Sequence, residues 1–170
     1  MNSQFLIEKL EFSDEYKKFI GENPTAYLCS GFFDIGTEKN SENKYHFDFY
    51  VPETKKTFSF QLEDGKLVEL ERNYEEKILD KVLLNRDFDF DKIKERIMIE
   101  MELQEIKNKI QKMIFSLQNI DGKDLLFGTI FLSGLGLLKV NIDIYDNKII
   151  DFEKKSLLDM IKVVKKNDKP

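Results

Sequence analysis

The stretch YHFDFYVPETKKTFSFQL, residues 45–62, decides the fold. In its first half every second side chain is apolar or aromatic: Tyr45, Phe47, Phe49 and Val51. After the turn-forming sequence PETK the alternation resumes with Phe58, Phe60 and Leu62. Successive side chains of a strand point to opposite faces, so this pattern predicts an antiparallel pair of strands with one buried face.

Further strands are expected on both sides of this pair. Residues 25–35 (TAYLCSGFFDI) are apolar on both alternating faces and predict a strand that is covered on both sides. The polar residues 36–44 predict a loop, because they lack periodicity and apolar side chains. A second meander is expected from residues 125–132, 137–145 and 148–153.

The register of the hairpin that follows residue 62 can also be predicted. A two-residue turn at Asp64 and Gly65 would break the apolar face. A three-residue connection, residues 64–66, would instead place Phe60 opposite Leu70. We therefore predict the longer connection.

Four segments have the apolar spacing of helices. Residues 5–20 carry a second N-cap at Ser13 and predict one bent helix or two short ones, and shorter helices are expected at 74–84 and 156–166. In residues 91–119 apolar side chains recur about every four positions, which predicts one helix of about 40 Å. A helix of that length exceeds a typical strand of about 20 Å, so it must cross the sheet diagonally, bend or project toward a partner.

The predicted class is therefore α+β, with antiparallel meanders packed against a long central helix. Residues 140–154 align without a gap on residues 58–72 at an offset of 82, and both stretches have the pattern of a strand, a turn and a second strand. An internal duplication and convergence on a good hairpin both explain this match. We expect a single domain over residues 1–170, with repeat halves 1–85 and 86–170 if the duplication holds.

The amino-acid composition excludes or disfavours several classes of protein. The chain of 170 residues is 41% hydrophobic and contains 15 Phe, which excludes a disordered linker. A single cysteine and an acidic start without an apolar leader predict a cytoplasmic protein, and the longest uncharged run, residues 125–138, is too short to span a membrane. The net charge of −5 disfavours nucleic-acid binding. Six lysines against two aspartates in residues 154–170 fit the end of a helix, or a contact with an acidic partner or a nucleic acid.

The best catalytic candidates are His46, Asp48 and Tyr50, because these residues share one strand face and a carboxylate beside an imidazole can support general-base catalysis. Their expected cross-strand neighbours, Thr57, Ser59 and Gln61, also fit a solvated sheet face without catalysis. If catalysis depends on the imidazole, His46→Ala abolishes turnover and leaves stability nearly unchanged.

Other reactive groups have structural explanations. Cys29 lies in an apolar strand, where burial raises the pKa of a thiol, and we expect a core cysteine. One His and one Cys cannot build a zinc site, so no metal is expected. Asp87, Asp89 and Asp91 imitate a calcium loop, but Lys92 and Met98 stand where such a loop needs Gly and Glu, so helix capping explains these acids.

Three glycines interrupt the apolar run of the second meander: Gly128, Gly134 and Gly136. They lack the spacing of a nucleotide-binding loop, so no cofactor is expected. We expect them where strands turn or a neighbour comes close, with a pocket mouth as the alternative.

Two functional hypotheses remain. The first is a non-enzymatic binding module that contacts a protein or peptide, or a second copy of itself, through an apolar groove, a sheet edge or the long helix. The second is an α+β cone that encloses a small apolar ligand, and acid-base chemistry at His46 would make it an enzyme. A closed aromatic cavity above about 300 Å³ would favour the second hypothesis.

Overall fold

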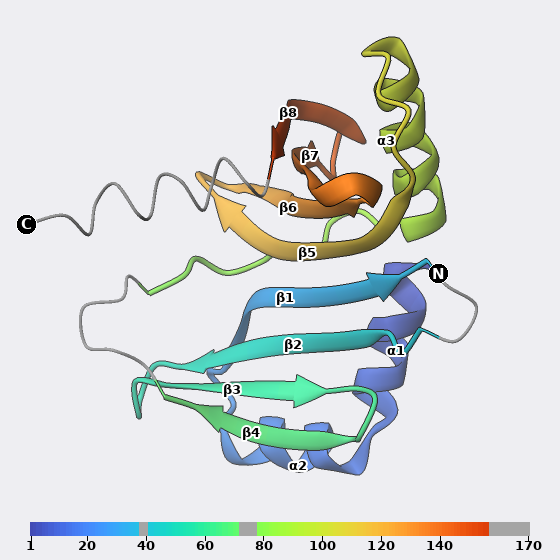
Figure 1. Cartoon of the computed structure of the whole chain (residues 1–170). Helices are drawn as coiled ribbons and strands as arrows, with labels where there is room; N and C mark the ends of the chain where they lie inside the picture. Colours follow the sequence, from blue (N-terminus) through green and yellow to red (C-terminus); the bar gives the residue numbers. More distant parts are fainter. Residues whose placement is uncertain (38–40, 72–77, 157–170) are drawn as a thin grey trace, which may run out of the picture.

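A computed structural model describes residues 1–37, 41–71 and 78–156. Across these residues eight strands form one antiparallel sheet in the order β4-β3-β2-β1-β5-β6-β7-β8 (Figure 1). The strands are β1 (Tyr27–Gly36), β2 (Lys44–Val51), β3 (Lys56–Gln61), β4 (Lys66–Leu70), β5 (Ile110–Ile120), β6 (Lys123–Leu132), β7 (Gly136–Asp143) and β8 (Lys148–Ser156). The sheet therefore consists of two four-stranded meanders that meet where β1 pairs with β5.

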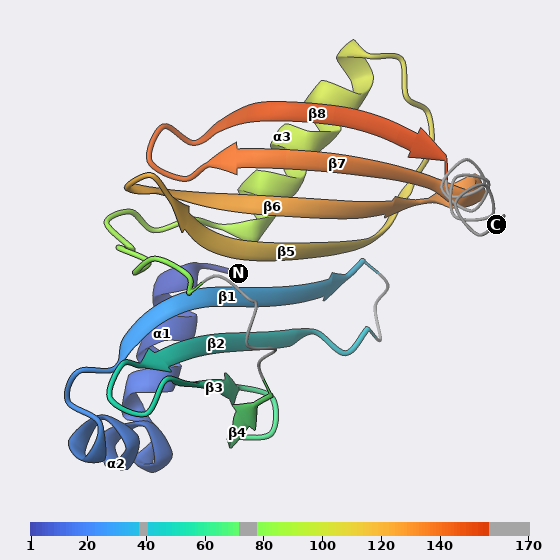
Figure 2. The same ribbon diagram turned by 90° about the vertical axis from the view of Figure 1, so that its left-hand side faces the viewer.

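Helices precede each meander along the chain. The first meander follows α1 (Ser3–Phe12) and α2 (Asp14–Glu22), and the second follows α3 (Phe90–Leu103). The helices cover the same face of the sheet, and in Figure 2 the strands lie in front of α1 and α3. A short 3-10 turn, Ser133–Leu135, links β6 to β7. The α+β class with antiparallel meanders is confirmed.

The core lies between this sheet face and the helices. Phe47 and Phe60 of the first meander and Ile142 of the second belong to one buried cluster, and Ile106 packs against it. The alternation predicted for β2 is confirmed, since its apolar side chains are buried: Tyr45, Phe47, Phe49 and Val51. Residues that are far apart in the sequence thus share one interior.

Local signals position the helices. Ser13 ends α1 and begins α2, where its hydroxyl accepts a hydrogen bond from the backbone N–H of Tyr16. The predicted N-cap is confirmed, and it produces two short helices. At the start of α3, the carboxylate of Asp89 accepts hydrogen bonds from the N–H groups of Asp91 and Lys92. This confirms the predicted capping role for Asp89, and Asp91 lies in the first turn of the helix.

The long helix predicted for residues 91–119 is wrong, because α3 ends at Leu103 and β5 begins at Ile110. Glu105 adopts a left-handed backbone with φ 56°, which a helix cannot continue. In β5 the buried side chains alternate: Met113, Phe115, Leu117 and Asn119. Residues four positions apart lie on one face of a helix and also on one face of a strand. The spacing therefore did not distinguish the two structures.

Two smaller helix predictions fall at the edges of the described residues. Residues 78–84 of the predicted helix 74–84 form no helix, and the rest of it includes residues outside the described part. Instead the backbone N–H of Val82 donates to the carbonyl oxygen of Leu28 at 2.9 Å, so this segment lies against the start of β1. The predicted helix 156–166 begins at Ser156, the last residue of β8, and its remainder lies outside the described residues.

The predicted register of the β3–β4 hairpin is also wrong. Phe60 pairs with Leu67, because the connection has four residues, 62–65, and ends at Gly65 with φ 63°. β4 is an edge strand, where Val68 and Leu70 are each 37% exposed. Burial of an apolar face therefore does not determine the register there.

The two aligned hairpins occupy corresponding places. Residues 58–72 contain β3 and β4 at one edge of the sheet, and residues 140–154 contain β7 and β8 at the other. Each hairpin has a four-residue connection that ends in a left-handed residue, Gly65 in the first and Asn147 in the second. These two residues are aligned at the offset of 82.

Candidate functional site

A groove of about 830 Å³ lies between the second half of α3 and the connection to β5. Met98 and Met101 contribute apolar surface from the helix, and Ile106 and Ile110 contribute it from the connection. Charged side chains also line the groove: Lys94, Glu102, Glu105, Lys107 and Lys109. The groove thus combines an apolar lining with charged groups of both signs.

The sequence of α3 explains why this groove is apolar. The helix buries one stripe at helical spacing, consisting of Phe90, Ile93, Ile97 and Met101. Three further apolar residues lie outside that stripe and remain exposed: Met98 at 52%, Ile99 at 59% and Leu103 at 74%. The end of α3 extends clear of the strands (Figure 1). A helix with more apolar side chains than its core face can bury presents the remainder to solvent or to a partner.

The second wall of the groove is held by hydrogen bonds. After the left-handed Glu105 the chain reverses, and the N–H of Ile106 donates to the carbonyl oxygen of Met101 at 2.8 Å. The side-chain amide of Asn108 donates to the carbonyl oxygen of Ser133 at 2.8 Å. The ammonium group of Lys154 at the end of β8 donates to the side-chain oxygen of Asn108 at 3.2 Å. Hydrogen bonds to the backbone therefore hold this wall of the groove in place, close to the end of β8.

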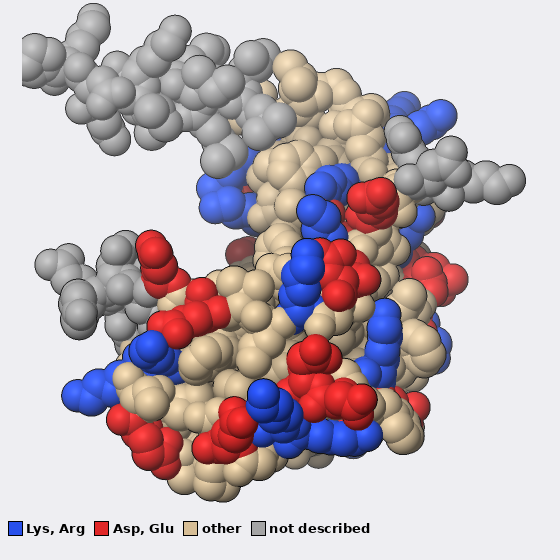
Figure 3. Space-filling view, turned by 90° about the horizontal axis from the view of Figure 1, so that it is seen from below, with Lys and Arg blue, Asp and Glu red and all other residues tan. Residues whose placement is uncertain are grey.

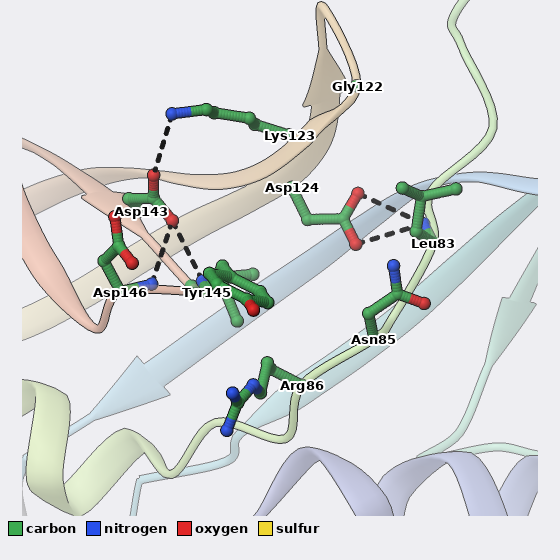
Figure 4. Close-up of a pocket in the computed structure, with 10 residues that line it drawn as sticks. Leu83, Asn85, Arg86, Gly122, Lys123, Asp124, Asp143, Tyr145 and Asp146 are labelled. Atoms are coloured by element: carbon green, nitrogen blue, oxygen red, sulfur yellow. Dashed lines mark hydrogen bonds and ion pairs between the residues drawn. The ribbon is translucent and has the colours of Figure 1, made fainter.

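A smaller cleft of about 110 Å³ lies where the segment after residue 82 crosses the turns of the second meander (Figure 4). The carboxylate of Asp124 accepts hydrogen bonds from the N–H groups of Leu83 and Leu84 and from the side chain of Asn119. The buried carboxylate of Asp143 accepts from the N–H groups of Tyr145 and Asp146. Both carboxylates thus hold backbone in place, which accounts for these charges without a ligand.

The guanidinium group of Arg86 lies over the ring of Tyr145, with its central carbon 4.9 Å from the ring centroid. Both residues line the small cleft and also a neighbouring cavity of about 310 Å³ near the start of α3. Phe88, Ile93 and Ile142 line that cavity together with charged side chains. Its lining is therefore a mixture of apolar and charged groups.

The start of α3 also carries electrostatic interactions. Partial burial acts to raise the pKa of the Asp89 carboxyl, but the hydrogen bonds from Lys92 and Asp91 and the charged N-terminus outweigh it and lower that pKa. The amino group of Met1 lies 3.7 Å from the carboxylate of Asp89 and also pairs with Asp91. These acids serve the helix cap and the chain terminus.

The catalytic candidates His46, Asp48 and Tyr50 lie in β2 and have different partners. The Nε2 atom of His46 lies 2.6 Å from Oε1 of Glu63, whereas the carboxylate of Asp48 accepts a hydrogen bond from Ser30 at 2.6 Å. The ring of Tyr50 packs edge-on against Tyr27. The cross-strand neighbours are as predicted, since His46 pairs with Gln61, Asp48 with Ser59 and Tyr50 with Thr57. His46 therefore contacts a carboxylate that the sequence did not indicate, and it does not line the three cavities described above.

The positions of Cys29 and of the three glycines are explained by packing and by turns of the chain. Cys29 is buried, as predicted, and its thiol donates to the carbonyl oxygen of Asp48. A Cβ atom on Gly128 would lie 2.8 Å from the ring of Phe115, which confirms that a neighbour comes close there. Gly134 has φ 72° in the turn between β6 and β7, and Gly136 begins β7.

No protein-family model, curated protein or solved structure matches this chain.

The surface gives further constraints. Within the described residues no group of three His, Cys, Asp or Glu side chains is arranged to hold a metal ion. Acidic and basic side chains are interspersed on the face that Figure 3 shows. Across the same described part of the chain, no helix combines the length and the apolar character needed to cross a membrane.

The sequence contained a signal for this groove that the predicted long helix concealed. Six apolar residues fall within residues 93–103, more than a single stripe of a helix can bury. Once the helix is known to end at Leu103, the excess residues Met98, Ile99 and Leu103 can be recognised as exposed. The wall formed by residues 104–110 required the three-dimensional structure.

Proposed function

We propose that this protein is a non-enzymatic binding module that takes an apolar segment of a protein or peptide into the groove at the end of α3. The observation that carries the proposal is the exposed apolar surface of Met98 beside the buried Met101 and the chain wall of Ile106 and Ile110. Methionine side chains are flexible and polarizable, which suits a surface that adapts to a bound segment.

The dimensions and charges of the groove support this proposal. A volume of about 830 Å³ is within the usual range of about 300–1,000 Å³ for binding sites. Helix-in-groove recognition buries an apolar stripe and leaves polar residues at the rim. Lys107 and Glu105 at this groove offer both signs of charge, so we expect the bound segment to be apolar on one side and of mixed charge on the other.

A small apolar ligand is the second candidate, and the cavity of about 310 Å³ near the start of α3 favours it. Phe88, Ile93 and Ile142 would contact such a ligand. The charged side chains of Arg86 and Asp87 in the same lining make the site less suited to a purely apolar molecule. We therefore place this hypothesis second.

We further propose that the two meanders arose by internal duplication. An offset of 82 residues, obtained from the hairpins, aligns Phe33 with Phe115, and these two residues pair directly across the β1–β5 junction. If a two-fold axis at the β1–β5 junction relates the two meanders, one residue of β1 must pair with the residue of β5 that is aligned with it. The aligned left-handed residues Gly65 and Asn147 support the same offset.

Selection of peptides on the full-length chain tests the proposed binding function. A library of random 16-residue peptides displayed on phage is the probe, and enriched peptides are synthesised and titrated by fluorescence anisotropy. We expect Met98→Glu to weaken binding by roughly tenfold or more, because a carboxylate in the groove must lose its hydration when an apolar segment binds.

The matched control is Phe12→Glu, which places the same charge on an exposed apolar position of α1. This variant is expected to bind the peptides as the unmodified chain does. The proposal fails if no peptide is enriched, or if Met98→Glu and Phe12→Glu bind the selected peptides equally well.

A further inference from the structure

The alignment between the two halves continues beyond the hairpins. At the same offset of 82, Ile78 aligns with Met160, Leu79 with Ile161 and Val82 with Val164. All three positions are apolar in both segments. The chain after β8, residues 157–170, lies outside the described residues, so its sequence is compared with the segment of the first half that the structure describes.

In the first half this segment closes the core. The hydroxyl of Tyr27 donates to the carbonyl oxygen of Leu79 at 3.3 Å, and the N–H of Val82 donates to the carbonyl oxygen of Leu28 at 2.9 Å. Val82 is 3% exposed and belongs to the core cluster, whereas Leu83 beside it is 44% exposed. The segment thus buries one side against the start of β1 and leaves the other in solvent.

The corresponding place in the second half is the groove. The offset aligns Tyr16 with Met98, Phe19 with Met101 and Leu28 with Ile110, and these three counterparts all line the groove. In the first half Phe19 and Leu28 belong to the core cluster and Tyr16 packs against it. Val82 of the first half is hydrogen-bonded to Leu28, whose counterpart Ile110 lines the groove in the second half.

The chain can reach this groove from the end of β8. β8 and β5 are separated by three strand spacings, or about 14 Å, and eight residues lead from Ser156 to Val164. Eight extended residues span up to about 26 Å. The hydrogen bond between Lys154 and Asn108 already brings β8 to the wall of the groove.

We propose that the chain's own C-terminal segment is a ligand of the groove, with Met160, Ile161 and Val164 filling it and Val164 lying against Ile110. The inference rests on the proposed function, since it assigns an occupant to the same groove. The segment would also regulate binding to the groove, because a partner must displace it in order to bind.

Disulfide trapping in the full-length chain tests the contact. Ile110→Cys combined with Val164→Cys is oxidised at low protein concentration, and the cross-linked peptides are identified by mass spectrometry. The counterparts Leu28 and Val82 are joined by a backbone hydrogen bond, so their Cα atoms are close enough for the geometry of a disulfide. We expect a disulfide between positions 110 and 164 within one chain.

The control pairs Val164→Cys with Lys123→Cys, an exposed position at the start of β6 and at the opposite end of the sheet. This pair is expected to form little intramolecular bond. Equal trapping in both pairs overturns the proposal. Trapping between two chains overturns it as well, because a second copy would then occupy the groove.

Hydrogen exchange gives a second measurement that needs no cysteine. Val164→Asp should speed amide exchange in residues 106–110 by about tenfold, the size expected from losing the burial of one valine side chain. Lys165→Asp is the matched control, since its counterpart Leu83 is exposed. Unchanged exchange in Val164→Asp contradicts the proposal.

The two proposals fail in different ways. If the groove binds selected peptides but the disulfide between positions 110 and 164 does not form, the intramolecular ligand is ruled out and the binding function stands. If the disulfide forms but no peptide binds in a Met98-dependent manner, the segment is a fixed part of the fold and the binding function is ruled out.

Discussion

Phe33 of β1 pairs directly with Phe115 of β5, and neither side chain has any exposed surface. The ring of Phe90 from α3 contacts both, with centroid distances of 5.0 Å to Phe33 and 5.8 Å to Phe115. β1 belongs to the first meander and β5 to the second. The two halves of the chain therefore share the centre of their core, and we expect them to unfold together.

Phe33→Ala tests this coupling. Removal of a fully buried ring should lower the free energy of unfolding by about 3–5 kcal/mol while preserving a single transition. Urea denaturation followed by circular dichroism measures both quantities. Phe12→Ala, at a ring that is 77% exposed, should change stability by less than about 0.5 kcal/mol. Two separate transitions in either protein would show that the halves unfold independently.

Gly128 provides a second test of packing at the same place. A methyl group on Gly128 would lie 2.8 Å from the ring of Phe115 and 3.2 Å from the carbonyl oxygen of Val140. Gly128→Ala should therefore destabilise the protein by about 1–3 kcal/mol, as overpacking does. The thermal unfolding midpoint reports the change.

The comparison variant is Gly21→Ala, because a Cβ atom there meets nothing within 4 Å and the residue lies in α2. Alanine favours a helix over glycine, so this variant should be more stable by about 0.5–1 kcal/mol. If both alanine variants shift the midpoint in the same direction, the close approach at Gly128 is not the cause.

The sheet could be predicted from the sequence because its strands alternate cleanly. Phe47 and Phe49 face the core and His46 and Asp48 the other side, as the pattern required. The segment after Leu103 was assigned wrongly to a helix, because the four-residue steps from Ile106 to Ile110 and from Met113 to Leu117 fit a helix and one face of a strand equally well. The pairing of Phe33 with Phe115 joins residues 82 positions apart, and periodicity within one segment contains no information about such a partner.

The sequence predicted an apolar groove as a possible contact surface but did not predict its position. An apolar groove was among the expected contact surfaces, yet its wall depends on the left-handed Glu105, a residue type without a special preference for that conformation. The contact between His46 and Glu63 was missed for a related reason. Glu63 lies in the four-residue connection whose register was predicted wrongly, so its side chain could not be placed beside β2.

The pair of His46 and Glu63 should make stability depend on pH. Partial burial acts to raise the pKa of the Glu63 carboxyl, but hydrogen bonds to its own backbone, to His46 and to Tyr45 outweigh it, so the pKa is lowered. The unfolded chain then binds a proton at a higher pH than the folded one, and this contribution to stability is lost as the pH falls through the folded pKa.

Glu63→Gln removes the titrating group. The difference in unfolding free energy between the unmodified chain and Glu63→Gln should be largest above pH about 5 and should shrink as the pH falls below about 4.5. Urea titrations across this range measure the difference. A gap that stays constant down to pH about 3 would show that the Glu63 carboxylate does not gain from its partners in the folded state.

Asp124 ties the segment between the two meanders to the second one (Figure 4). Its carboxylate accepts hydrogen bonds from the N–H of Leu83 at 3.0 Å and of Leu84 at 2.7 Å. Asp124→Ala leaves these donors without their acceptor, so we expect a loss of about 1–3 kcal/mol and faster amide exchange at both residues. Asp146→Ala removes a carboxylate from the same cleft whose side chain anchors no backbone N–H, and it should change stability by less than about 0.5 kcal/mol. Equal losses in the two variants would mean that the general charge of the cleft, rather than the anchoring of residues 83 and 84, stabilises this junction.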